Sequence, residues 1–163
     1  MKKKLLLLFL LLSVLFPLAA DELCWKGQAL SSWQQRKNVK VSFSGSLLKV
    51  EFTADDAQIT GPAVRIDPAK FNCFSITYRA KGVKNDYGEM YFAHDPENFS
   101  SRKYWKIPKL NSDWQWHTVV IESNALFNKH NWFEGGIIYG LRLDPVNKAG
   151  GIMEISEIKF FKK

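Results

Sequence analysis

The sequence predicts an all-β protein, either a sandwich or a barrel of short antiparallel strands. Most segments alternate apolar and polar side chains with a period of two, the pattern of a half-buried strand. Clusters of Gly, Ser, Asn, Asp and Pro separate these segments at close spacing, as turns do in all-β domains. No segment carries a convincing stripe with a period of 3.6 residues, and the best helical candidates are residues 29–37 and 123–128.

The first half of the chain shows the alternation most clearly in two neighbouring runs. Residues 39–43 and 48–52 each place their apolar side chains on one face of a pleated strand. Residues 44–46 read Ser-Gly-Ser, a turn signal, so the two runs are expected to form a hairpin. A shorter run at 63–66 ends at an Asp-Pro pair, residues 67–68.

The second half predicts further strands, of which two have special features. They are expected at residues 74–80, 89–93, 103–107, 116–122, 137–143 and 152–161. The run at 137–143 is apolar at nearly every position, as a central strand buried on both faces would be. In the last run Ile155 and Ile158 are three apart, out of phase for a flat strand. A β-bulge near residues 156–157 would turn both side chains inward.

The N-terminus has the three parts of a secretory signal peptide. Lys2, Lys3 and Lys4 precede an apolar run, and Ala19 and Ala20 supply a small-residue exit. The run is shorter than the ~20 residues of a membrane helix, although an uncleaved anchor is the alternative. We therefore expect residues 1–20 to be a signal peptide and residues 21–163 to form one domain. The mature protein would be secreted or periplasmic, with no stable membrane span.

Composition limits the partners of the mature domain. The whole chain of 163 residues has a formal net charge of +7, and three of those charges are lysines of the signal segment. The remaining lysines are scattered and form no block of like charge, so nucleic-acid binding is not expected. A domain of this length buries enough surface to fold without a covalent staple.

Both cysteines, Cys24 and Cys73, lie in the mature domain. Two thiols in an oxidising compartment often pair, which makes a disulfide between them a candidate. The alternative is two separate thiols that pack as small apolar side chains. The chain has no second cysteine pair and no Cys/His cluster, so a structural zinc site is not expected.

Four motifs in the second half carry a resemblance to a known family. They are residues 88–92 (GEMYF), 113–121 (DWQWHTVVI), Trp132 followed by residues 140–145 (GLRLDP), and residues 151–160 (GIMEISEIKF). In this order and spacing the chain resembles the galactose-binding-like β-sandwich domains, which include many carbohydrate-binding modules. The resemblance implies a jelly-roll β-sandwich of two antiparallel sheets. It also implies binding of a polysaccharide or other glycan without cleavage. No catalytic domain accompanies the module in this sequence.

A saccharide site needs flat aromatic rings beside hydrogen-bonding side chains. Seven residues are candidates for ligand binding: Arg79, Glu89, Tyr91, Trp105, Trp114, Trp132 and Arg142. Trp114 lies in a turn and Trp132 in a long polar connection, while Trp105 and Tyr104 point to opposite faces of one strand. Tyr91 shares a strand face with Glu89. The alternatives are packing for the rings and surface salt bridges for the arginines.

Three other tryptophans are expected in the core. Trp116 is in phase with Thr118 and Val120 on its strand, and we expect that side to face inward. Trp25 and Trp33, near the start of the mature chain, are also expected to be core or closure residues.

Neither a cofactor nor catalysis is expected. Relatives of the resembled family often carry structural calcium, and its oxygen ligands would come from Asp55, Asp56, Asp67 and Asp144, although these form no recognised calcium loop. The histidines have no H-x-x-x-H or H-E-x-x-H spacing, and no G-x-S-x-G motif occurs. The predicted function is a secreted, non-catalytic glycan-binding module. The alternatives are an extracellular or envelope module that binds a protein and, third, a hydrolase. The sequence does not fix the oligomeric state.

Overall fold

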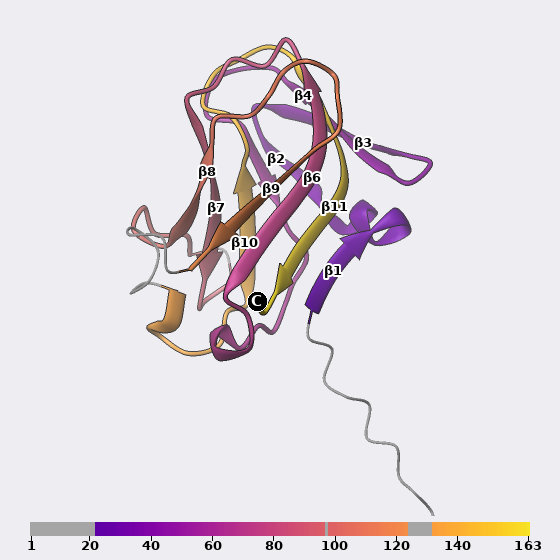
Figure 1. The fold of residues 1–163 in the computed structure, drawn as a ribbon. Coiled ribbons are helices and arrows are strands. Elements are labelled where there is room, and N and C mark those ends of the chain that lie inside the picture. The colour runs from indigo at the N-terminus through magenta and orange to yellow at the C-terminus, as the bar shows by residue number, and fades with distance from the viewer. Residues whose placement is uncertain (1–21, 97, 124–131) are drawn as a thin grey trace, which may run out of the picture.

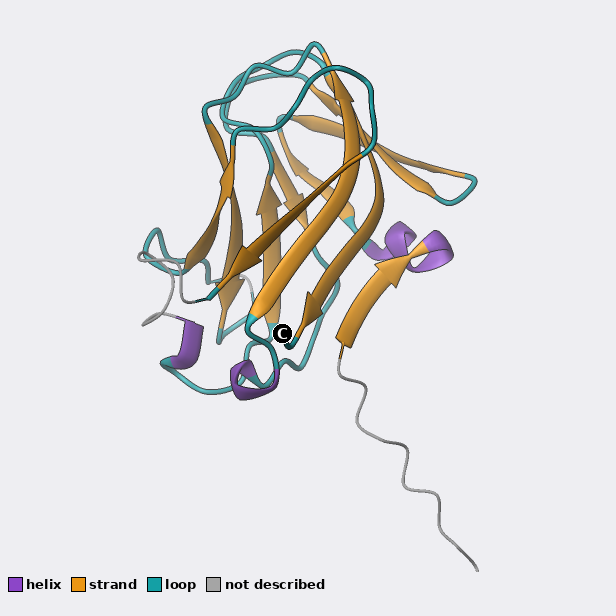
Figure 2. Ribbon diagram, in the orientation of Figure 1, coloured by secondary structure: helices purple, strands orange, loops and turns teal. Residues whose placement is uncertain are grey.

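The protein is a sandwich of two antiparallel β-sheets, seen in a computed structural model that describes residues 22–96, 98–123 and 132–163 (Figures 1 and 2). The six strands of sheet A are β1 (Glu22–Lys26), β3 (Val39–Ser44), β4 (Leu47–Phe52), β6 (Cys73–Lys81), β9 (His117–Glu122) and β11 (Ile152–Phe161). The five strands of sheet B are β2 (Gln34–Lys37), β5 (Gln58–Thr60), β7 (Tyr87–Ala93), β8 (Tyr104–Pro108) and β10 (Gly140–Asp144). The predicted all-β jelly-roll sandwich is confirmed.

Strand order places the longest strand, β11, inside sheet A and β10 at the centre of sheet B. Sheet A runs β3-β4-β11-β6-β9, and β1 also pairs with β11; sheet B runs β2-β5-β10-β7-β8. The predicted hairpin is confirmed as β3 and β4, in which Val41 lies opposite Val50. The predicted bulge is also confirmed, because the register between β11 and β6 shifts between Ile155 and Glu157.

The helical candidate at residues 29–37 is helical only over residues 29–32. The short 3-10 helix η1 (Gly27–Ser32) is followed at once by strand β2. Packing ends the helix there, because Trp33 is buried with its ring edge-on to Trp25, at 5.5 Å between ring centroids. This also confirms the core positions predicted for both tryptophans. A second 3-10 helix, η2 (Pro68–Lys70), is capped by the Asp67 carboxylate, which accepts from the Ala69 backbone N–H at 3.0 Å.

The cysteine pair predicted as a candidate disulfide is not bonded. Cys24 and Cys73 are free thiols, and burial raises the pKa of each. Strand β11 lies between them, since Cys24 pairs with Lys159 on one flank and Cys73 pairs with Phe161 on the other. Two strand spacings amount to about 9–10 Å, beyond the ~4.4–6.8 Å that a disulfide allows between Cα atoms. The alternative of two separately packed thiols is therefore the correct one.

Some sequence predictions fall outside the described ranges. The signal peptide expected at residues 1–20 and most of the helical turn expected at 123–128 lie there, so they stay predictions. Among the residues that the structure does describe, no helix is long and apolar enough to cross a membrane.

Candidate functional site

The outer face of sheet B carries one row of side chains that crosses all five strands. Strand register aligns Gln34, Thr60, Arg142, Tyr91 and Tyr104, from β2 at one edge to β8 at the other. Alternate residues of these strands point the other way and are buried in the core, for example Leu141 and Leu143 of β10, Met90 and Phe92 of β7, and Trp105 of β8. We call this outward-facing side of sheet B, with the row and the loop residue Phe99, the sheet B face.

Arg142 is held at the centre of the sheet B face by a carboxylate and two rings. Its Nε donates to Asp144 Oδ1 at 2.9 Å and its Nη2 donates to Asp144 Oδ2 at 2.8 Å. The guanidinium also lies 4.1 Å from the ring centroid of Tyr91 and 5.2 Å from that of Phe99. The side chains of Arg142 and Asp144 are only 14% and 9% exposed. Three N–H groups of the guanidinium remain beyond those that bind Asp144.

Burial sets the protonation of this cluster. It raises the pKa of Asp144 to about 6, with the nearby charges of Asp56 and Glu89 acting in the same direction and Arg142 opposing them. Burial likewise raises the pKa of Tyr91, whose hydroxyl donates to Glu89 Oε2 at 2.7 Å. Tyr91 is therefore a neutral donor at physiological pH, and its hydroxyl is already paired.

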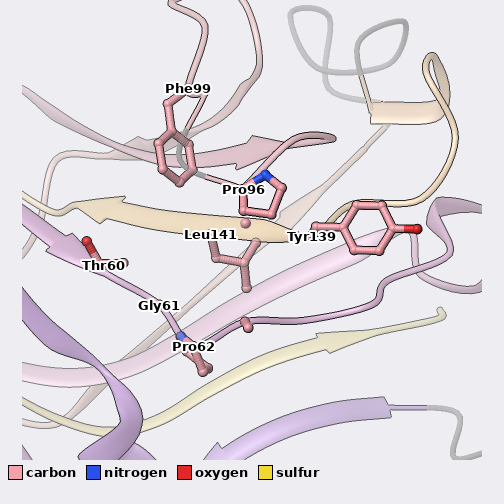
Figure 3. A pocket seen from close by; sticks show the side chains of 9 residues that line it. Thr60, Gly61, Pro62, Pro96, Phe99, Tyr139 and Leu141 are labelled. Atoms are coloured by element: carbon pink, nitrogen blue, oxygen red, sulfur yellow. The ribbon is translucent and has the colours of Figure 1, made fainter.

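A hollow lies on this side of the sandwich, and one of its lining residues, Phe99, is the ring that also contacts Arg142 (Figure 3). Gly61, Ala63 and Gly140 line the hollow, and Phe99 and Tyr139 form part of its rim. Its volume is about 120 Å³, smaller than the ~300 Å³ at which pockets for drug-sized ligands begin. A ligand would therefore lie on this surface with only a part of it seated, and would not be enclosed.

Gly61, which lines the hollow, is required by close packing of the backbone. A Cβ at this position would lie 2.9 Å from Leu141 Cβ and 3.1 Å from the Trp33 ring. The backbone comes this close because the Gly61 N–H donates to the Leu141 carbonyl at 2.8 Å. Larger residues at position 61 would push β5 and the segment after it away from β10.

Three of the seven predicted binding residues, Glu89, Tyr91 and Arg142, meet on the sheet B face. Two others, Arg79 and Trp114, lie together on the outer face of sheet A, on the opposite side of the sandwich. There the Arg79 guanidinium is 4.5 Å from the Trp114 ring centroid and 5.1 Å from that of Trp116.

The prediction that Trp105 and Trp132 bind ligand is wrong. Both indoles are fully buried and pack edge-on against one another at 4.7 Å between centroids. Trp132 also stacks on Phe160 at 5.5 Å, and its Nε1–H donates to the Phe71 carbonyl at 2.7 Å. These contacts leave no ring face for a ligand, so both residues belong to the core.

Trp116 was predicted in the core and is 45% exposed. The alternation along β9 is as predicted, but the side with Ile121 faces the core, where Ile121 is buried. Thr118 and Val120 lie on the other side and are exposed along with Trp116. Sequence reasoning also missed Phe99, Tyr139 and the pairing role of Asp144. Only Asp144 had a usable signal, since it stands two residues after Arg142 and so shares its strand face.

The four aspartates considered for calcium do not form one ligand set, although Asp56 and Asp144 both line a second hollow. Asp55 accepts from the Ala149 N–H at 2.6 Å, Asp56 from Lys37 at 2.6 Å, Asp67 caps η2 and Asp144 binds Arg142. Across the described ranges, no group of three or more His, Cys, Asp or Glu residues is arranged to hold a metal ion.

No family model matches the chain. No curated protein matches it either. Solved structures do resemble it. A xylan-binding module of family 86 from Roseburia intestinalis superposes with a TM-score of 0.56 at 10% identity, covering 87% of this chain and 96% of that one. A family 6 module from Clostridium cellulolyticum, in complex with xylose, gives 0.56 at 9%, covering 87% and 98%.

A family 29 module solved with cellulohexaose gives a TM-score of 0.54 at 5% identity, covering 85% of this chain and 89% of that one. At such low identities these likenesses show the fold alone. The chain therefore has the β-sandwich fold of carbohydrate-binding modules, and the fold implied by the sequence resemblance is confirmed.

Proposed function

We propose that this protein is a non-catalytic module that binds an uncharged polysaccharide on the sheet B face. One observation carries the proposal: a hollow lined by the Phe99 and Tyr139 rings lies next to the guanidinium of Arg142, which Asp144 holds in place. A sugar ring has an apolar C–H face and a hydroxyl edge, and these two surfaces match the hollow and the guanidinium. The fold shared with xylan-binding and cellulohexaose-bound modules supports the same reading.

Each part of the sheet B face has a role in this proposal. A sugar ring stacks against Phe99 and Tyr139 at the hollow, and the floor formed by Gly61 and Gly140 lets it approach the backbone. The free N–H groups of Arg142 donate to hydroxyl oxygens of the ring or its neighbour. Arg142 is already oriented by Asp144, so little side-chain entropy is lost on binding.

The charges of the row favour an uncharged ligand. Arg142 is paired with Asp144, and the neighbouring Asp56 is paired with Lys37, so these four charges compensate one another. The carboxylates around Arg142 are also engaged: Glu89 by the Tyr91 hydroxyl, Asp144 by Arg142 and Asp56 by Lys37. A glycosidase needs one carboxyl group as acid and a second as base or nucleophile across the scissile bond. Since all three carboxylates here serve structure, binding without hydrolysis is the function the face supports.

Export belongs to the proposal as well. The signal peptide predicted at residues 1–20 would deliver the domain at 21–163 outside the cytosol, where insoluble polysaccharides occur. The other function considered, binding of a protein partner, calls for a broad flat apolar area. The sheet B face instead interleaves rings with Arg142 and Glu89, which supports it less well.

Affinity electrophoresis and calorimetry on xylan, a β-glucan and cellohexaose test the proposal. Phe99→Ala is expected to weaken binding about tenfold or more, because the loss of one stacking ring costs about 1–3 kcal/mol of binding free energy. Phe133→Ala is the matched control, an exposed ring (47%) that lines neither the hollow nor the Arg142 row. Circular dichroism checks that both variants fold. Equal binding by Phe99→Ala and the control would remove the site, and no binding by the natural chain to any neutral glycan would remove the function.

A further inference from the structure

We infer that the outer face of sheet A holds a second, independent saccharide-binding site, built on Arg79, Trp114, Trp116 and Glu154. The inference takes its ligand class from the proposed function, but it places the ligand on the opposite side of the sandwich. We call these four residues the sheet A clamp.

Strand register brings the members of the clamp into one row. Glu154 of β11 lies opposite Arg79 of β6. On the other flank of β6, Tyr78 pairs with His117 of β9, so Arg79 lies opposite the residue just before β9, Trp116. Arg79 Nε donates to Glu154 Oε2 at 2.7 Å and Arg79 Nη2 contacts the same oxygen at 2.6 Å. The guanidinium is thus fixed in place between its carboxylate and two indole rings.

Trp114 reaches Arg79 from a strained turn. Its φ is +63°, a left-handed value that is an outlier for a bulky side chain. The conformation is held because the Trp114 N–H donates to the Ala80 carbonyl at 2.8 Å. On the other side of the residue, Asp113 Oδ1 accepts from the Gln115 N–H at 2.9 Å and is bonded to His117 Nε2 at 2.7 Å. Strain of this kind collects at ligand sites, and here it positions an aromatic ring on the surface.

The exposure of the clamp points to a ligand that covers it. Trp116 is 45% exposed, whereas a ring used only to pack against Arg79 would gain from being covered. Thr118 continues the exposed side of β9, and its hydroxyl is hydrogen-bonded to that of Thr77 at 3.0 Å. Rings, a guanidinium and hydroxyls therefore lie side by side on one sheet face.

This chemistry selects an uncharged saccharide over a protein surface. Arg79 and Glu154 neutralise each other within the clamp, and the one further charge of the row, Lys49 opposite Glu154 on β4, lies at the end away from the two indole rings. A polar pair at the centre of the row also breaks up the continuous apolar area that a protein partner or a second copy would bury. A sugar stacked on Trp116 can donate hydroxyls to Glu154 and accept from the unused N–H groups of Arg79.

Two sites on opposite faces would make the domain bivalent. The sheets lie back to back, so one molecule could hold two separate polysaccharide chains and join them. A module with one site would bind a polysaccharide without joining its chains.

The test follows cellohexaose or a xylo-oligosaccharide by NMR, and soluble xylan or β-glucan by light scattering, on the natural chain. The expected result is that the indole N–H signals of Trp114 and Trp116 shift on titration, both in the natural chain and in Phe99→Ala. Trp116→Ala is expected to abolish cross-linking of the polysaccharide, lowering scattering at least fivefold, while it still binds through the sheet B face. Phe133→Ala, with a similarly exposed ring, is expected to cross-link like the natural chain.

Two outcomes would overturn the inference, and they differ from each other. If signals of the sheet B face shift while those of Trp114 and Trp116 stay fixed, and Trp116→Ala scatters like the natural chain, the domain has one site. If no signal on either face shifts with any neutral glycan, the proposed function itself fails and the second site fails with it.

Discussion

The two outer faces of the sandwich use the same constellation at different depths. Each fixes an arginine on a carboxylate and stacks it on two aromatic rings, Arg142 on sheet B and Arg79 on sheet A. The Arg142–Asp144 pair is 14% and 9% exposed, and the Arg79–Glu154 pair is 30% and 14% exposed. The deeper pair lies within β10, the central strand of sheet B, whereas the shallower one joins the central strand of sheet A, β11, to β6, which is next to the edge strand β9. Depth therefore determines how far each pair contributes to folding and how far its arginine is open to a ligand.

The largest expected effect that tests this comparison is on stability. Arg142→Ala leaves Asp144 buried without its partner, which should lower the free energy of unfolding by about 3–5 kcal/mol at pH 8. Arg79→Ala acts on a pair that water reaches better, and should cost about 1 kcal/mol. Urea unfolding of both variants measures the two values. Equal losses would show that depth does not separate the faces.

The second prediction concerns pH and only the sheet B face. Burial raises the pKa of Asp144 to about 6 in the folded protein, whereas an aspartate in an unfolded chain has a pKa of 3.8. The folded state therefore binds this proton more tightly than the unfolded state. The contribution of Asp144 to the free energy of unfolding should therefore increase as pH falls from about 7 to 4, by up to about 3 kcal/mol.

Asp144→Asn provides the comparison for that experiment, because it removes the titrating group. Urea unfolding at several pH values between 4 and 7 should give the natural chain a steeper rise toward low pH than the variant. Asp56 and Asp113, whose pKa values are lowered, act below this window. Parallel pH profiles for the two proteins would mean that burial does not raise the pKa of Asp144.

The smallest expected effect separates two tyrosines of the sheet B face. Tyr91→Phe removes the hydroxyl that donates to Glu89 at 2.7 Å, and should cost about 1.5–3 kcal/mol as the loss of a hydrogen bond to a charged group. The Tyr104 ring lies 5.4 Å from that of Tyr91, but its hydroxyl makes no hydrogen bond within the described part of the chain. Tyr104→Phe should stay within about 0.5 kcal/mol. Thermal unfolding distinguishes the two, and a reversed order would contradict the hydrogen-bond assignment.

Local patterning predicted much of the fold because alternation and turn residues act over a few positions. The β3–β4 hairpin and the bulge in β11 follow from spacing alone, and so does the shared face of Glu89 and Tyr91. The all-β sandwich then follows from the number of such strands. The helical candidate at 29–37 is helical only to residue 32, where the buried Trp33 follows and strand β2 begins.

Which side of a strand faces inward was harder to predict than the strand itself. On β9 the two sides carry similar apolar content, so Trp116 was assigned to the core while tertiary packing buried Ile121 instead. On β8 the opposite directions of Tyr104 and Trp105 were predicted, but the larger ring went inside. Phe99 reaches the sheet B face from a loop, so no spacing in the sequence indicates that it stacks on Arg142.

The position of β11 constrains when the molecule can fold. This strand pairs with β1 and β4 along one flank and with β6 along the other, yet it follows all of them in the sequence. During synthesis the open edges of β4 and β6 must wait for Ile152–Phe161 to emerge, and unpaired strand edges are prone to associate with other chains. Sheet A is thus completed only after all of residues 22–161 have been made, in whichever compartment the chain has then reached.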